Sequence, residues 1–220
     1  MTTAAGPDAV EDSLVLNLDA GNYRSYPGSG NTWYDLSGSK TNCTLVNNPS
    51  FSISNGGFLI FTGTQFGIVP LPSVLTVSNF SYNIWVYPTA LGGWQTMIDQ
   101  DNDDFLFATL GSTVQLYDQS INTGINLSVN TWYNLSVTYN SGSPVLFYKN
   151  GKLEYNGPNA STTHTTSNYG IGGGITGSLP SPTADELWLG RIAIVQIYNR
   201  ALTSNEITQN FNANRGRFGI

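Results

Sequence analysis

Residues 187–207 read LWLGRIAIVQIYNRALTSNEI, and this stretch decides the fold. Its first part, up to Tyr198, is an almost continuous run of apolar and β-branched residues, which is typical of a buried strand. The tetrapeptide TSNE at 203–206 then has the pattern of a capping box, in which the threonine hydroxyl and the glutamate carboxylate satisfy free amides at a helix start. Ile207 and Phe211 follow on one helix face. We therefore predict a long strand and then one short helix that packs on a sheet.

Short apolar runs at regular spacing precede this stretch, separated by Gly, Pro, Asn and Ser. Two of them, FSYNIWVY at 80–87 and WYNLSVTY at 132–139, place every second residue on one face. Asn150-Gly151 predicts a hairpin, because a type I′ turn needs positive φ at both central residues. The other expected strands cover 14–18, 58–61, 66–69, 96–98, 105–107, 113–117 and 145–149. Strands of this number with one helix predict an all-β antiparallel sandwich of the jelly-roll type.

Charge and cysteine content exclude several classes of protein. Only 10% of the 220 residues are charged, and the net charge is −6. Phosphate binding needs a basic stripe, so neither nucleic acid nor an anionic membrane is an expected partner. Cys43 is the only cysteine, so no internal disulfide can form. We expect an N-terminal arm at 1–12, one sandwich domain at 13–214 and a C-terminal tail at 215–220.

The acidic residues do not have the arrangement that a glycosidase needs. Retaining hydrolysis uses two carboxyl groups about 5–5.5 Å apart, which a strand supplies at positions two residues apart. No glutamate has an acidic residue two or four positions away in an expected strand, and the only histidine lies in a threonine-rich loop without a nucleophile elbow nearby. These residues are Glu11, Glu154, Glu186, Glu206 and His164. We therefore predict that the chain is not an enzyme and needs no cofactor.

One acidic segment is a candidate ligand or calcium site. Residues 99–104 read DQDNDD, so Asp99, Asp101 and Asp103 could supply hard oxygen ligands to calcium. The segment lacks the glycine and the final glutamate of an EF-hand loop, and a solvated acidic turn is the favoured interpretation. Trp94 lies just before it, and an exposed Trp94 with Asp99 and Asp101 would suit saccharide binding. For a single tryptophan, however, core packing is the more common role.

These motifs together resemble the concanavalin A-like lectin/glucanase superfamily, in its laminin G-like branch. The resemblance is carried by WLGRIA and IYNRALT with EI at 188–207, LDA at 18–20, WYDLSG at 33–38, the strand at 80–88, NTWY at 130–133 and YKNG at 148–151. It implies a jelly-roll sandwich. It leaves the function open, because the superfamily includes lectins, adhesion modules and enzymes.

The opening motif at 18–38 and the closing motif QNFNANRGRFG at 209–219 are similar to domains of tailed-phage structural proteins. The first residues, MTTAAGPDAVEDS, show no signal-peptide pattern. The resemblance implies a virion protein, as a capsid decoration or fibre/adhesion protein, with other virion proteins as partners and self-association into a homo-oligomer. The arm and the tail residues Arg215, Arg217 and Phe218 are then the expected assembly contacts. The alternatives are a lectin module for cell-surface glycans and, third, a degenerate glucanase.

Overall fold

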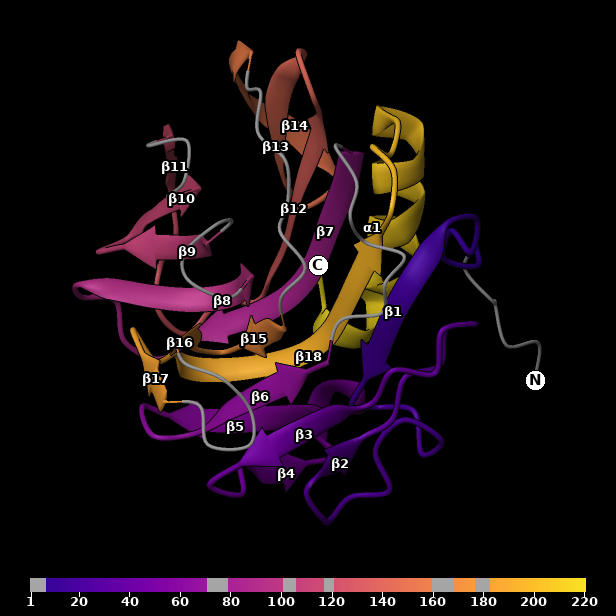
Figure 1. The fold of residues 1–220 in the computed structure, drawn as a ribbon, viewed down its shortest axis with the longest axis vertical. Coiled ribbons are helices and arrows are strands. Elements are labelled where there is room, and N and C mark those ends of the chain that lie inside the picture. Colours follow the sequence, from indigo (N-terminus) through magenta and orange to yellow (C-terminus); the bar gives the residue numbers. More distant parts are fainter. Residues whose placement is uncertain (1–6, 71–78, 101–105, 117–120, 160–167, 177–182) are drawn as a thin grey trace.

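The computed structural model describes residues 7–70, 79–100, 106–116, 121–159, 168–176 and 183–220. Two antiparallel sheets of eight strands each form a sandwich in this part of the chain, beside a small pair of strands (Figure 1). The first sheet contains, in order, β14 (Lys152–Asn159), β13 (Pro144–Lys149), β12 (Tyr133–Asn140), β7 (Asn79–Pro88), β18 (Leu189–Tyr198), β5 (Phe58–Thr62) and β4 (Ser50–Ser52), with β1 (Leu14–Asp19) also paired to β18. The second contains β11 (Ile121–Asn126), β10 (Thr113–Leu116), β9 (Phe107–Leu110), β8 (Trp94–Gln100), β15 (Tyr169–Ile171), β6 (Phe66–Val69), β3 (Cys43–Val46) and β2 (Thr32–Trp33). The small pair is β16 (Gly174–Thr176) with β17 (Thr183–Asp185).

The predicted alternation of the two long central strands is confirmed. β7 and β12 lie side by side, and their in-phase residues all join the core between the sheets. These residues are Phe80, Tyr82, Ile84, Val86, Tyr133, Leu135, Val137 and Tyr139. The alternation therefore sets the register of these strands, because a one-residue shift in either would turn its large side chains away from the core. The fold is the all-β sandwich that the sequence predicts.

The hairpin predicted at Asn150-Gly151 is also present. Both residues have positive φ, 52° and 75°, and they connect β13 to β14. β18 curves strongly along its length (Figure 1), and its register with β7 shifts between Ile192 and Ile194. Gly190, near the start of the same strand, has no room for a side chain, because an added Cβ would come within 2.3 Å of the Tyr87 carbonyl oxygen.

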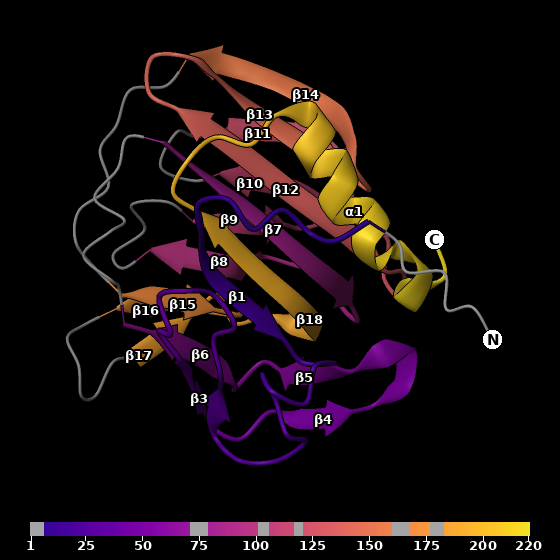
Figure 2. The ribbon, with the colours of Figure 1, turned by 90° about the vertical axis from the view of Figure 1, so that its right-hand side faces the viewer.

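The C-terminal helix α1 (Ser204–Phe218) covers the outer face of the first sheet, across β7, β12 and β18 (Figure 2). Its capping box is confirmed: Thr203 Oγ1 accepts from the Glu206 amide, and the Glu206 carboxylate accepts from the Thr203 amide. Ile207 is fully buried beside Leu202, in the arrangement of a hydrophobic staple before and after the helix start. In the described part of the chain, no helix has the length and apolarity needed to cross a membrane.

The described residues near both ends of the chain, from residue 7 and up to residue 220, pack on the domain. The segment expected to be a tail from residue 215 is still helical as far as Phe218. In the expected arm, Val10 is buried; its amide donates to Asn210 Oδ1 at 2.8 Å, and its carbonyl accepts from the Tyr198 hydroxyl at 3.0 Å. Asp12 pairs with Arg200 at 2.9 Å. The described part of the arm thus lies against α1 and β18.

Candidate functional site

The acidic segment predicted from the sequence is only partly within the described residues. Trp94 opens β8 and is half-buried, whereas Asp99 is fully buried further along the same strand. One oxygen of Asp99 accepts the Ile175 amide at 2.9 Å. Asp101 and Asp103 lie outside the described residues, so the calcium and ligand roles of this segment stay predictions. Within the described ranges, no three His, Cys, Asp or Glu side chains come together as a metal site would require.

Two of the glutamates make structural contacts. Arg200 donates to both oxygens of Glu206, at 2.6 and 2.9 Å, and Lys152 lies 3.6 Å from Glu154. The hydrogen bonds from Arg200, with those from Thr203, lower the pKa of Glu206 to about 2. Glu206 is therefore ionised near neutral pH and stabilises the N-terminus of α1, where a negative charge is favourable.

The opening motif forms a turn that many hydrogen bonds hold in one conformation. Asp19 Oδ1 accepts the Gly21 amide at 2.9 Å, and the Asn22 carbonyl accepts the amides of Ser25 and Tyr26 at 2.8 and 2.9 Å. Ser25 Oγ donates to the Tyr34 carbonyl at 2.6 Å and accepts the Asp19 amide at 3.0 Å. The backbone of the turn is consequently fixed before any ligand arrives.

A cleft of about 200 Å³ lies between this turn and the segment that follows β4. We call it the Tyr23 pocket; its main lining residues are Gly21, Tyr23, Tyr26, Pro27, Phe51 and Ile53. Its rim is exposed, 79% at Tyr23 and 73% at Ile53, whereas Tyr26 is buried with its ring centroid 5.4 Å from that of Phe51. Burial raises the pKa of the Tyr26 hydroxyl, which donates to the Gly30 carbonyl at 2.9 Å. The pocket therefore has an apolar floor and an exposed aromatic ring at its entrance.

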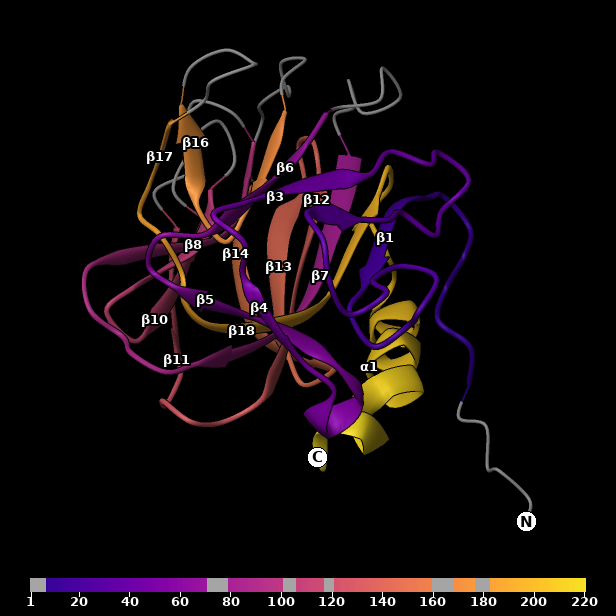
Figure 3. The ribbon, with the colours of Figure 1, turned by 90° about the horizontal axis from the view of Figure 1, so that it is seen from below.

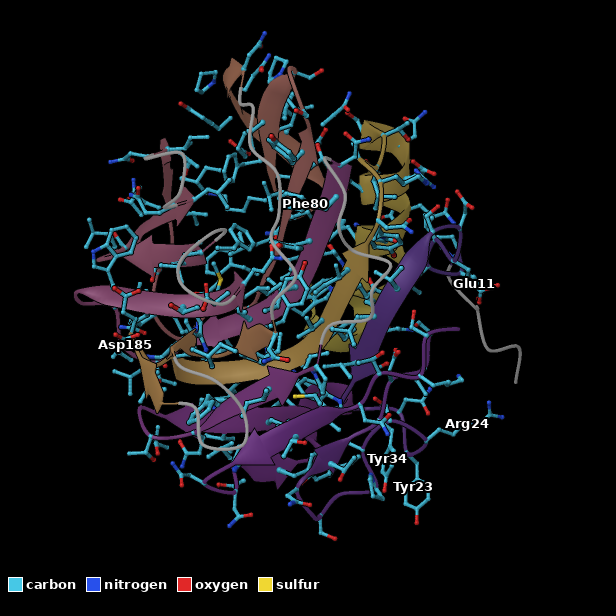
Figure 4. The ribbon with its side chains drawn as sticks, viewed as in Figure 1. Glu11, Tyr23, Arg24, Tyr34, Phe80 and Asp185 are labelled. Carbon is cyan, nitrogen blue, oxygen red and sulfur yellow. The ribbon has the colours of Figure 1, made fainter. Side chains whose placement is uncertain are left out.

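A charged side chain, Arg24, and an aromatic one, Tyr34, lie in the same region as Tyr23. Figure 4 shows Tyr23, Arg24 and Tyr34 in one region of the surface, away from Asp185 at the opposite side. Tyr34 is 44% exposed, and its amide donates to the Ser25 carbonyl at 2.7 Å. The exposed guanidinium of Arg24 can donate hydrogen bonds to a ligand beside these rings.

The walls of the Tyr23 pocket meet because glycines allow a very close approach. An added Cβ on Gly21 would lie 1.6 Å from the Gly56 carbonyl oxygen, in the 3₁₀ turn η1 (Ser54–Gly56). Arg217 from the last turn of α1 donates to both oxygens of Asp19 at 2.9 Å and to the Gly56 carbonyl at 3.0 Å. Figure 3 shows this end of α1 beside the segment after β4. The helix end thus ties the two walls together.

Arg215, Arg217 and Phe218, the tail residues expected to mediate assembly, differ from one another in exposure and contacts. Arg217 is engaged in the contacts just described, and Phe218 is only 5% exposed. The Phe218 ring stacks on Trp85 with centroids 4.2 Å apart and lies 4.6 Å from Trp132. Arg215 is exposed, above the Phe211 ring at 5.9 Å. Of the three, Arg215 alone is placed for contact with another molecule without a rearrangement of the helix.

A larger, more polar hollow of about 430 Å³ lies between the arm, β1 and α1. Its polar lining is largely used within the chain. Gln196 Nε2 donates to Asn17 Oδ1 at 3.4 Å, and both Asp19 and Asn214 accept from Arg217. The hollow therefore offers a ligand few unused hydrogen-bonding groups, and the Tyr23 pocket is the stronger candidate site.

The sequence model of one protein family, described as the concanavalin A-like lectin/glucanases superfamily, matches residues 61–208. The chain belongs to this superfamily. The matched range includes the core of the sandwich and the start of α1, and it leaves out the Tyr23 pocket, whose lining lies before residue 61. No curated protein matches the chain.

Several solved structures have the same fold as this chain, although their sequences are only 16–18% identical to it. The fourth domain of an extracellular arabinanase from Geobacillus stearothermophilus, solved with arabinotriose, has a TM-score of 0.68 and 16% identity over 91% of this chain and 98% of that one. The binding domain of Paraclostridial Mosquitocidal Protein 1 has a TM-score of 0.69 and 17% identity over 92% of this chain and 52% of that one. A structure of botulinum neurotoxin type C, whose cell entry is described as dependent upon interaction with two ganglioside molecules, has a TM-score of 0.67 and 18% identity. The match covers 93% of this chain and 52% of that one. The chain spans about half the length of these two toxin chains and has a lectin-like fold.

The Tyr23 pocket was not identified as a site from the sequence. Its one local signal is an aromatic residue between polar neighbours, Asn22 and Arg24, inside a turn motif. Phe51 and Ile53, on the other side of the pocket, lie about 25–30 positions later in the sequence. Strands as short as β2 and β4 have too few residues to show a hydrophobic period.

Proposed function

We propose that this chain is a non-enzymatic, lectin-like module that binds a saccharide in the Tyr23 pocket. The observation that carries the proposal is the Tyr23 ring, which is 79% exposed on a turn fixed by hydrogen bonds. One face of a sugar ring consists of C–H groups and packs well on an aromatic ring. Tyr23 and Ile53 together leave exposed apolar surface beside a cleft, which is the kind of surface that marks a ligand-binding groove.

The pocket also has the size and polarity that suit a single sugar ring. Drug-sized ligands occupy pockets of roughly 300–1,000 Å³, and this cleft of about 200 Å³ is smaller. Its apolar floor suits a C–H face of the sugar, while the exposed Arg24, next to Tyr23 in the turn, can donate to hydroxyl oxygens. Affinity then comes from one stacked ring and a few peripheral hydrogen bonds.

The solved relatives support this class of ligand. The arabinanase domain, which this chain covers almost completely, was solved with arabinotriose, and the type C toxin is described by its interaction with gangliosides. Both ligands are carbohydrates or contain them. Arabino-oligosaccharides are therefore the first probes for this chain.

The resemblance of the opening and closing motifs to tailed-phage structural proteins supports a second proposal. The module would be a virion protein, as a capsid decoration or fibre/adhesion protein, which assembles with other virion proteins and with copies of itself. The observation that favours it is the contact between the two motifs, since Arg217 of the closing motif donates to both carboxylate oxygens of Asp19 in the opening motif. Mass spectrometry of purified phage particles would test this proposal: presence of the chain supports it, and absence from intact particles contradicts it.

A glycan array probed with the purified chain tests the saccharide proposal. We expect binding to a limited set of glycans and no release of reducing sugar from those glycans. Failure to bind any glycan would contradict saccharide recognition. Turnover of a bound glycan would contradict the non-enzymatic assignment.

A further inference from the structure

A second feature lies on the outer face of the first sheet, beyond the area that α1 covers. The strand registers place four side chains in one row across β4, β5, β18 and β7: Ser50, Ile60, Arg191 and Tyr87. Ser50 is exposed and the other three are half-buried. We call this row the Arg191 strip.

Aromatic rings hold the Arg191 guanidinium on both sides. Its Cζ lies 4.2 Å from the centroid of the Tyr87 ring and 4.7 Å from that of Phe58. Trp132 supports both rings, with centroids 5.4 and 5.6 Å away. Phe58 and Trp132 are buried, so the side chain of Arg191 is held by a fixed aromatic frame.

The hydrogen-bonding capacity of Arg191 is unused in the described part of the chain. Arg200 and Arg217 each donate to carboxylates and carbonyls, whereas Arg191 has no ion pair and no hydrogen bond to a described protein group. A guanidinium has five N–H donors in one plane, in a fork that matches a planar carboxylate. An oriented cation with no carboxylate partner among the described residues is unexpected in a chain with a net charge of −6.

We propose that the Arg191 strip is an anion subsite that binds the carboxylate of an acidic saccharide. The carboxylate would pair with the free edge of the guanidinium, and the sugar C–H groups would contact Ile60 and Tyr87. The half-buried apolar surface beside the charge favours an acidic sugar over inorganic phosphate, which has no apolar face. The net charge of −6 favours a ligand with one isolated negative charge over a polyanion.

This inference rests on the proposed saccharide-binding function but uses a different surface. Successive residues of a strand point to opposite faces. Phe51 of β4 lines the Tyr23 pocket, while its neighbour Ser50 lies in the Arg191 strip. The two sites are therefore separated by the edge of the sheet and can be tested independently.

Calorimetric titration with matched ligands tests the inference. We expect the chain to bind sialyllactose better than lactose and glucuronic acid better than glucose, with the difference falling as salt is added. Arg191→Gln should weaken acidic-sugar binding about tenfold or more, and Arg191→Lys should restore only part of it, because an ammonium lacks the planar fork. Neutral-sugar binding should be unchanged in both variants.

A matched control separates the role of Arg191 from a general effect of positive charge. Lys152→Gln removes an exposed cation on β14 and should leave the preference for acidic over neutral sugars intact. Equal binding of acidic and neutral sugars by the unaltered chain, or unchanged acidic-sugar binding by a folded Arg191→Gln variant, would overturn the inference while leaving the Tyr23 pocket untouched. Inorganic phosphate binding as tightly as glucuronic acid would also overturn the saccharide assignment. Circular dichroism and urea unfolding establish that each variant is folded.

Discussion

The Arg217 guanidinium donates to both carboxylate oxygens of Asp19, at 2.9 Å each, and joins two residues 198 positions apart in the chain. The same side chain donates to Gly56 at 3.0 Å, so three segments meet at one arginine. The end of α1 therefore shapes the Tyr23 pocket, although it contributes no lining residue to it. We therefore expect stability and saccharide binding to be coupled through this contact.

Replacement of Arg217 by glutamine should affect both properties. The ion pair is partly buried, and hydrogen bonds to charged groups contribute more than neutral ones. We expect the free energy of unfolding to fall by about 1–2 kcal/mol and saccharide affinity to decrease as the pocket walls separate. Urea unfolding and calorimetry measure the two effects. Arg24→Gln is the matched control for stability, and a pocket that binds equally well after Arg217→Gln would refute the coupling.

Removal of residues 215–220 should destabilise the fold. It deletes Phe218, whose buried ring packs against Trp85 and Trp132. Loss of a buried phenylalanine costs roughly 3–5 kcal/mol. Urea unfolding should show a large loss for Phe218→Ala and a larger one for the truncated chain, which also loses the Arg217–Asp19 pair. A truncated chain of unchanged stability would contradict the packing described here and would return these residues to an assembly role.

The Glu206–Arg200 pair predicts how stability depends on pH. The folded-state pKa of Glu206 is lowered from its ordinary 4.5 to about 2, chiefly by the hydrogen bond from Arg200. A lowered pKa stabilises the folded state above the unfolded-state pKa, and this contribution disappears as pH falls through the folded-state pKa. The stability difference between the unaltered chain and Glu206→Gln should therefore be constant above about pH 5 and shrink towards pH 2. A difference independent of pH over this range would argue against the ion pair.

Gly67 and Cys43 form a tight contact between neighbouring strands of the second sheet. A Cβ added at Gly67 would lie 2.5 Å from Cys43 Sγ, and both sites are buried. Gly67→Ala should lower the free energy of unfolding by about 1–3 kcal/mol, because overpacking forces side chains to move. In a Cys43→Ala background the same substitution should cost much less. Equal costs in the two backgrounds, measured by urea unfolding, would show that the sulfur atom is not the obstacle.

The sequence predicted those features that short-range patterns encode. The core faces of β7 and β12 follow from alternation, the start of α1 from its capping box and the turn at Asn150 from its dipeptide. The end of α1 was not predicted, because Gly216 is a poor helix former. The helix nevertheless continues to Phe218, where burial against Trp85 outweighs that local preference.

The candidate site could not be predicted in the same way, because contacts distant in sequence build it. Tyr23 lies in a motif that the sequence identifies, yet its pocket exists only where that turn meets Phe51, Ile53 and the η1 turn. The Arg191 strip likewise depends on strand order, which places β5 and β7 on the two sides of β18. Neither neighbour is adjacent to β18 in the sequence.

Titration calorimetry with the best glycan from the array, comparing the unaltered chain with Tyr23→Ala and Tyr23→Phe, tests saccharide binding in the Tyr23 pocket most directly. Loss of the ring should weaken binding about tenfold or more, since an aromatic contact and its buried area are removed together. Tyr23→Phe should retain most of the affinity, and Leu153→Ala, at an exposed apolar site on β14, should have no effect. Full affinity in a folded Tyr23→Ala variant would contradict the assignment.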